Sequence, residues 1–188
     1  MQKGNTMNRA IKFKLKNDKI VTIRRIRGTD YDAVVKFFDK AVRDKSVKYT
    51  SLYLGQPKQN KDSFVAMHNN PNNLFLGAWY GQDLVGECTT IKISPENPKY
   101  RGLTAETGTT ILNEFTSNGL GNKFKTIVEK WAVENGVHKL YAEVFHKNIR
   151  ALNNLMKLGY NIVGIKHNAA IVDKELMHIY TLEKTLKK

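Results

Sequence analysis

The sequence predicts one mixed α/β domain of the α+β type, in which a single sheet carries helices on its faces. Three observations support this fold class. The chain has 188 residues, of which 41% are hydrophobic and 26% charged, as in a globular domain that buries its own core. Apolar residues recur with the two-residue period of strands in some segments and with the helical period in others. The helical segments lie between strand segments rather than in a separate block.

The first half of the chain begins with a hairpin pattern and continues with two helices. Thr29 to Asp32 resembles a helix-capping box. The helix that it opens has four apolar residues on one face: Val34, Phe38, Ala41 and Val42. The elements expected here are strands over 11–15 and 20–26, the capped helix, and a second helix within 59–69.

The second half alternates strands with two amphipathic helices. Prolines mark a loop over 94–102, and glycines after Asn135 and Leu158 end the two helices. The elements expected here are strands over 73–80, 83–93 and 105–112, a helix from Leu120, a strand over 137–145, a helix over 149–158, and strands over 160–166 and 174–182.

Composition and charge exclude several classes of protein. The single cysteine, Cys88, excludes an intramolecular disulfide and any zinc site with two or more thiolates. No apolar run is long enough to cross a bilayer, and residues 1–9 form a polar, flexible segment, so we expect a cytoplasmic protein. Lys and Arg total 31 against 17 acidic residues, which gives a net charge of +14. The basic residues are dispersed along the chain, which disfavours a nucleic-acid partner.

Two glycines stand between a predicted strand and a predicted helix, at Gly119 and Gly121. Amide N–H groups at a helix N-terminus have no partners inside the helix, and the helix dipole adds positive potential there. Glycines let a pyrophosphate approach the backbone, and Lys123 and Lys125 add positive charge. The turn predicts an anion-binding site, although an ordinary strand-to-helix turn has the same appearance.

Two further motifs follow this turn. The next predicted strand leads to Asn148, with Ala151 three residues later, and the following helix ends in Leu158-Gly159-Tyr160. Together with Gly119 and Gly121, these motifs resemble the Gcn5-related N-acetyltransferase (GNAT) superfamily. The resemblance implies a GNAT-like domain over residues 10–188, with a mixed, mostly antiparallel central sheet of about seven strands flanked by about four helices.

The resemblance implies an acetyl-CoA-dependent N-acetyltransferase, an acyltransferase that moves an acetyl group to a primary amine in a ternary complex. Acetyl-CoA is then the cosubstrate, and no metal is expected. The residues implied to contact acetyl-CoA are Ile111, Leu112, Asn113, Asn118, Gly119, Leu120, Gly121, Asn122, Lys123, Asn148, Asn153 and Leu155.

The resemblance also implies a carboxylate that removes the proton of the amine. Glu143 is the first candidate, Glu106 the second and Glu87 the third, and a solvated or hydrogen-bonded strand carboxylate is the alternative for each. Leu112, on the strand before the glycine turn, is implied to provide a backbone N–H that polarises the thioester carbonyl.

Two positions depart from the pattern of the superfamily. Thr116 stands where Arg or Gln is usual, and Leu155 stands where many members have a tyrosine that protonates the leaving thiolate. Because a thiol has a pKa of about 8.5, coenzyme A leaves as a thiolate with little help. We therefore expect a slower enzyme or a different acid.

Other function classes stay open. A coenzyme A-binding module without catalysis would explain Thr116 and Leu155, and the net charge motivates a nucleic-acid-binding protein. The acceptor groove is assigned to residues 28–70 and 94–103, and the basic composition favours an acidic or neutral amine over a polyamine. The acceptor is either a small molecule or a protein or peptide amine. A homodimer is left open, and no membrane partner is expected.

Overall fold

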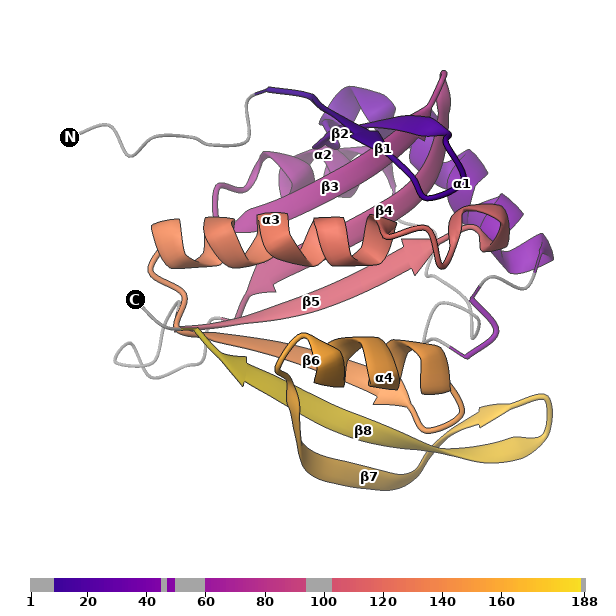
Figure 1. Cartoon of the computed structure of the whole chain (residues 1–188), viewed down its shortest axis with the longest axis vertical. Coiled ribbons are helices and arrows are strands. Elements are labelled where there is room, and N and C mark those ends of the chain that lie inside the picture. The colour runs from indigo at the N-terminus through magenta and orange to yellow at the C-terminus, as the bar shows by residue number, and fades with distance from the viewer. Residues whose placement is uncertain (1–8, 45–46, 50–59, 94–102, 187–188) are drawn as a thin grey trace.

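Eight strands form one sheet, and their order across it is β1-β2-β3-β4-β5-β6-β8-β7 (Figure 1). The structure is a computed structural model that describes residues 9–44, 47–49, 60–93 and 103–186. The strands are β1 (Ile11–Lys14), β2 (Ile20–Arg25), β3 (Asn73–Tyr80), β4 (Asp83–Lys92), β5 (Thr104–Ile111), β6 (Lys139–Phe145), β7 (Asn161–Val172) and β8 (Glu175–Thr185). The helices are α1 (Tyr31–Arg43), α2 (Lys61–Asn69), α3 (Leu120–Glu134) and α4 (Ile149–Lys157).

The predicted fold class is confirmed, with eight strands where about seven were expected. The described part of the chain contains four α-helices, each close to its predicted position. The predicted flexible segment, residues 1–9, lies outside the described residues except for Arg9, and the predicted loop over 94–102 lies outside them altogether. None of the helices in the described ranges combines the length and the apolar character that crossing a membrane requires.

The last hairpin is longer than the sequence predicted. Strands were expected over 160–166 and 174–182, but β7 continues to Val172. The turn falls at Asp173 and Lys174, whose φ angles of 49° and 68° are those of a tight hairpin turn. β7 is an edge strand whose residues are nearly all exposed, so its sequence lacks the alternation that marks a half-buried strand.

The start of α1 is fixed differently from the predicted capping box, because no side chain caps this helix. Asp30 instead accepts a hydrogen bond from the Arg27 N–H at 2.8 Å and binds the Arg24 guanidinium at 2.7 and 2.9 Å. Arg24 also stacks on Trp79, 4.1 Å from the ring centroid. The buried face of α1 consists of Val34, Phe37 and Ala41, whereas Val42 is exposed.

Helices cover both faces of the sheet. α1 and α2 lie behind it in Figure 1, while α3 and α4 lie in front. α1 packs on β4 and α2 on β3, whereas α3 packs on β4 and β5. Large side chains from both layers and from the sheet are almost fully buried: Phe37, Phe124, Ile23, Leu74, Leu76 and Leu140.

β5 and β6 are the one parallel pair among the described strands, and they pair over only three residues. Residues 104–106 of β5 face residues 139–141 of β6, and the last pair is Glu106 with Tyr141. β5 then continues to Ile111 with β4 on one side and none of the described strands paired on the other. The sheet is therefore open between the carboxyl ends of these two strands, and α3 and α4 begin at this opening.

Candidate functional site

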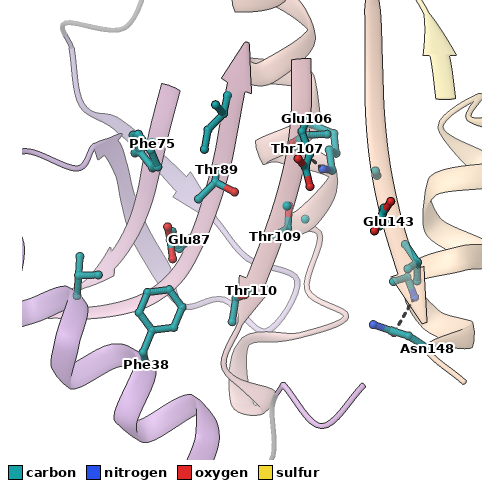
Figure 2. A pocket seen from close by; sticks show the side chains of 18 of the residues that line it. Phe38, Phe75, Glu87, Thr89, Glu106, Thr107, Thr109, Thr110, Glu143 and Asn148 are labelled. Atoms are coloured by element: carbon teal, nitrogen blue, oxygen red, sulfur yellow. Dashed lines mark hydrogen bonds between the residues drawn. The ribbon is translucent and has the colours of Figure 1, made fainter. Parts of the chain in front are cut away.

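A cavity of about 1030 Å³ lies where β5 and β6 part (Figure 2). Its lining includes residues of α1 and α2 from one face of the sheet and of α3 and α4 from the other. The cavity therefore passes through the opening in the sheet and joins the two faces. Its volume is at the upper end of the range of about 300–1,000 Å³ that is usual for ligand sites.

The glycines before α3 have two different roles. Gly119 has a φ of +87°, a left-handed conformation that favours glycine. Gly121 lines the cavity, where a Cβ would lie 3.7 Å from Ile111 Cδ1 and 3.8 Å from Asn154 Nδ2, both ordinary contacts. Gly119 thus permits the left-handed backbone of the turn, and Gly121 keeps the cavity beside the helix N-terminus free of a side chain. The unpaired first-turn amides suit a pyrophosphate at this point.

Two backbone amides of β5 point toward the opening and have no partner among the residues that the structure describes. The Leu112 N–H donates to the Val85 carbonyl at 3.0 Å and so points toward β4. Amides alternate in direction along a strand, so those of Thr109 and Ile111 point toward β6, which does not pair with β5 beyond Glu106. Contrary to the prediction, the Leu112 N–H is already bonded and is not free to polarise a carbonyl. Thr109 was missed from the sequence, because strand alternation gives the two directions of the amides but not the side of β5 that lacks a neighbour.

Several predicted cofactor residues line the cavity. Asn148 is the N-cap of α4, where its Oδ1 accepts a hydrogen bond from the Ala151 N–H at 3.2 Å. Its Nδ2 donates to the Tyr49 carbonyl, also at 3.2 Å. Leu155 lies on α4 and is 6% exposed. At the usual tyrosine position the cavity therefore has an apolar surface without a proton donor.

The other predicted cofactor residues are not part of the lining: Ile111, Leu112, Asn113, Asn118, Gly119, Leu120, Asn122, Lys123 and Asn153. The Asn118 side chain donates to the Thr116 carbonyl at 2.9 Å and so holds the turn. Asn113 Nδ2 donates to the carbonyl at the C-cap of α1 at 3.0 Å. Asn153 is exposed, and its neighbour Asn154 lines the cavity instead. The helix period, rather than sequence proximity, decides which of these asparagines faces inward.

Glu87 on β4 is the most buried carboxylate of the cavity, with 5% of its surface exposed. Among the described residues, no donor or cation pairs with its carboxylate. Burial raises the pKa of Glu87 to about 8. Figure 2 shows this side chain near Phe38. At neutral pH Glu87 is therefore mostly a neutral acid, which can donate a hydrogen bond.

The other two candidate bases have opposite pKa shifts. Glu106 stands at the closed end of the opening, where partial burial raises its pKa, nearby Glu143 adds to the rise and Lys166 opposes it. Glu143 accepts hydrogen bonds from the Lys166 ammonium and the Tyr141 hydroxyl. Burial alone would raise the pKa of Glu143, but these two bonds and the Lys166 charge outweigh it, and the net pKa is lowered. Of the two, Glu106 is the better proton acceptor near neutral pH.

An apolar wall covers the same face of the sheet as Glu87 and Glu106. It consists of aliphatic and aromatic side chains of α1, α2 and β3: Val34, Val35, Phe38, Val42, Phe64, Met67 and Phe75. His68 lies between two of these rings, with centroid distances of 3.7 Å to Phe64 and 4.1 Å to Phe75. Burial lowers the pKa of His68, so this ring adds no charge to the wall at neutral pH.

Lys125 is buried against the sheet, whereas its charge was expected at the first turns of α3. It is 4% exposed, and its ammonium donates to Thr107 Oγ1 at 3.0 Å. Lys125 follows Gly121 by four residues, so both lie on the side of α3 that lines the cavity. The four-residue spacing was visible in the sequence. It did not indicate that Lys125 faces inward, because a lysine beside apolar residues of a helix is usually exposed.

The sequence model of the acetyltransferase (GNAT) domain family matches residues 23–179 of the chain. The chain belongs to the GNAT acetyltransferase family. Its cavity thus lies in a domain of a family named for acetyl transfer. A search of curated proteins returned no significant match.

Solved structures of GNAT proteins share the fold. A GNAT-family acetyltransferase from Streptococcus pneumoniae aligns with a TM-score of 0.76 and 18% identity, over 89% of this chain and 99% of that one. A protein of Salmonella typhimurium, named as a putative acetyltransferase and solved with acetyl-CoA, aligns with a TM-score of 0.73 and 15% identity, over 89% of this chain and 95% of that one. The ribosomal-protein-alanine N-acetyltransferase of Brucella melitensis aligns with a TM-score of 0.72 and 16% identity, over 87% of this chain and 99% of that one. At these identities the likeness concerns the fold.

Replacing Glu87 with Gln is expected to remove a pH dependence of stability. The carboxyl has a pKa of about 8 in the folded state against 4.5 for an ordinary glutamate. Between these values the folded state binds more protons, so the free energy of unfolding falls as the pH rises from 4.5 to 8. The full loss is on the order of 5 kcal/mol, because each pKa unit corresponds to about 1.4 kcal/mol.

Thermal unfolding between pH 5 and pH 9 measures this effect. E87Q should unfold at a higher temperature than the parent above about pH 8, with the difference shrinking toward pH 5. The exposed Asp62, changed to Asn, is the control and should keep the parent curve. Parallel curves for E87Q and the parent would contradict the raised pKa.

Proposed function

We propose that this protein transfers an acetyl group from acetyl-CoA to a primary amine by direct attack in a ternary complex. The observation that carries the proposal is a single cavity that connects the N-terminal turn of α3, through the gap between β5 and β6, to the carboxylates on the other face. A cosubstrate bound on the α3 side and an amine bound on the α1 side would meet within the sheet. The family, whose members share this fold, supports the same reaction class.

The residues present fit acetyl-CoA. The first-turn amides of α3, with Gly119 and Gly121, suit its pyrophosphate. The unpaired amides of Thr109 and Ile111 suit the pantetheine arm and the carbonyl at its end. Bound acetyl-CoA supplies a thioester carbonyl that is activated toward amines. Thr116, at the usual Arg or Gln position, donates its hydroxyl to the Asn113 carbonyl at 2.8 Å, so it serves the turn.

Glu106 is the proposed proton acceptor. It stands beside the residues that border the opening, its pKa is raised toward neutrality, and the lining of the cavity includes it. The attacking nitrogen must lose a proton, because a free amine is mostly charged at pH 7. Glu143 is held by Lys166 and Tyr141, and Glu87 is mostly protonated. Glu143, the first candidate from the sequence, is therefore placed second here.

The Thr109 N–H is the proposed donor to the oxygen that becomes negative during attack. The nitrogen–carbon bond forms, the carbon–sulfur bond breaks, and the electron pair of that bond leaves on sulfur. Leu155 provides no acid, so the sulfur departs as a thiolate and takes its proton from water. The presence of Leu155 in place of the usual tyrosine is also the observation that favours the second candidate function, a coenzyme A-binding module without turnover.

The acceptor is proposed to be a primary amine on an apolar or aromatic body. The wall formed by α1, α2 and β3 would bury such a body, while Glu106 and Glu87 would face the amine. An acidic acceptor, which the net charge of the chain favours, would be repelled by the Glu106 carboxylate. A small aryl- or alkylamine and an N-terminal peptide residue both fit, and an amine panel of matched size separates them.

The first prediction concerns the cofactor end. Gly121→Glu should abolish the binding of acetyl-CoA, because the new side chain enters the cavity beside the helix N-terminus and adds negative charge. The Cβ itself has only ordinary contacts and the backbone φ is not left-handed, so the fold should survive. Isothermal titration calorimetry measures the affinity. Thr126→Glu, which adds the same charge on the exposed side of α3, is the control and should bind as the parent does.

The second prediction concerns the base. Glu106→Gln should lower kcat by about 10²- to 10⁴-fold and remove the acidic limb of the pH profile. Its affinity for acetyl-CoA should remain within about twofold of the parent, because Glu106 lies beyond the cofactor end. Glu143→Gln should lower kcat by less than about tenfold. The reverse ranking would make Glu143 the base, and binding without turnover in the parent over the amine panel would support the non-catalytic module.

A further inference from the structure

Lys125 is a buried cation that the fold does not pair with an acid. Its ammonium has one hydrogen bond, to Thr107 Oγ1 at 3.0 Å. Within the residues that the structure describes, no carboxylate lies within salt-bridge distance of it. Glu129, one turn further along α3, is bound by the Lys184 ammonium at 2.6 Å. An unpaired buried charge is costly, so this position suits a ligand that brings a negative charge.

The surroundings of the Lys125 ammonium are polar but neutral. Thr107 Oγ1 also accepts a hydrogen bond from Thr90 at 3.3 Å and lies 3.8 Å from Cys88 Sγ. An ammonium has three donors, and Thr107 takes one of them. Burial lowers the pKa of Lys125, against Cys88 and Glu129, which raise it. Donors therefore remain for a ligand, and a bound anion would hold the lysine in its charged form.

The position of Lys125 along the opening indicates which ligand atoms it would meet. Thr107 is the first residue of β5 beyond the last pair with β6, so it marks the closed end of the opening. The Thr109 amide lies two residues nearer the mouth, a distance of about 6.7 Å along a strand. A carbonyl held at Thr109 would thus lie within the length of a short acyl chain from the Thr107 hydroxyl that Lys125 binds, and all three residues line the cavity.

We propose that Lys125 binds the terminal carboxylate of a dicarboxylic acyl group, so that the preferred donor is a short dicarboxylic acyl-CoA such as succinyl-CoA. This inference rests on the proposed function, since it assigns the acyl group of the same donor. The transfer forms the same amide bond and breaks the same thioester bond, and the terminal carboxylate is unchanged by the reaction.

The carboxylate belongs to the donor rather than to the acceptor. Lys125 extends from α3, on the face of the sheet opposite to α1, and Gly121 at the cofactor end precedes it by one helical turn. An acceptor on the α1 side meets Glu87 and Glu106 first. The Glu106 carboxylate would repel an acceptor carboxylate, while an acyl chain reaches Lys125 from the α3 side without passing either acid.

Calorimetric titration with three thioesters and no acceptor tests the proposal. Succinyl-CoA carries the terminal carboxylate, butyryl-CoA has the same chain length without it, and acetyl-CoA is the short reference. We expect succinyl-CoA to bind at least about tenfold more tightly than butyryl-CoA, as for one charge-assisted hydrogen bond in a buried site. This comparison uses the parent protein alone and does not depend on a variant.

Two lysine variants assign the effect to a residue. Lys125→Met, of similar shape without the charge, should lower the affinity for succinyl-CoA at least about tenfold and leave that for butyryl-CoA within about twofold. Lys130→Met, on the exposed side of the same helix, should change neither affinity. Thermal unfolding verifies that each variant is folded.

Three results would overturn the proposal. Equal affinities of the parent for succinyl-CoA and butyryl-CoA would do so, as would an unchanged preference in K125M. A preference for amine acceptors with a carboxylate that disappears in K125M would reassign the lysine to the acceptor. In each case, binding of acetyl-CoA leaves the proposed function standing. If neither acetyl-CoA nor free coenzyme A binds, both proposals fall.

Discussion

The structure depends on the early end of pairing between β5 and β6. A parallel pair normally continues along both strands, but here it ends after Glu106 and leaves the rest of β5 with one open side. The unpaired amides of that side would be costly if they were buried without partners. An extended ligand arm that lay along β5, as proposed for the cosubstrate, would supply those partners. Both α3 and α4 begin on the side of the sheet where β5 and β6 end, and the opening joins the two faces of the sheet in one cavity.

The electrostatics of the cavity are local and do not follow the net charge. The chain carries a net charge of +14, yet the described lining includes Asp39, Glu87, Glu106 and Glu143 against Lys125 as a cation. The three glutamates differ because one is fully desolvated, one is partly buried beside another acid, and one is paired with Lys166. The surroundings of each glutamate, rather than its residue type, therefore determine how its pKa is shifted. The net charge of the chain carries no information about these local shifts.

Much of the fold could be predicted from the sequence, because most strands are half-buried and the helices are amphipathic. The exceptions have physical reasons. β7 is an exposed edge strand without alternation, and Asp30 binds Arg24 instead of capping α1. In the site, the glycine turn and Asn148 were identifiable from spacing. The free amide of Thr109 was not, because it depends on which side of β5 lacks a neighbour, and the burial of Lys125 depends on packing between α3 and the sheet.

The two hydrogen bonds of Asn148 connect two segments that line the cavity, the first turn of α4 and the backbone at Tyr49. Its carbonyl oxygen caps α4, and its amide nitrogen donates to the backbone carbonyl of Tyr49, which lines the cavity and packs against Phe145, Val172 and Met177. A ligand that displaces Tyr49 must carry this side chain with it or break the bond, and a ligand that shifts the first turn of α4 acts on the same bond from the other end. If each ligand shifted its own end of this bond, the two binding events would share a coupling free energy. By linkage, each ligand would then change the affinity of the protein for the other by the same factor.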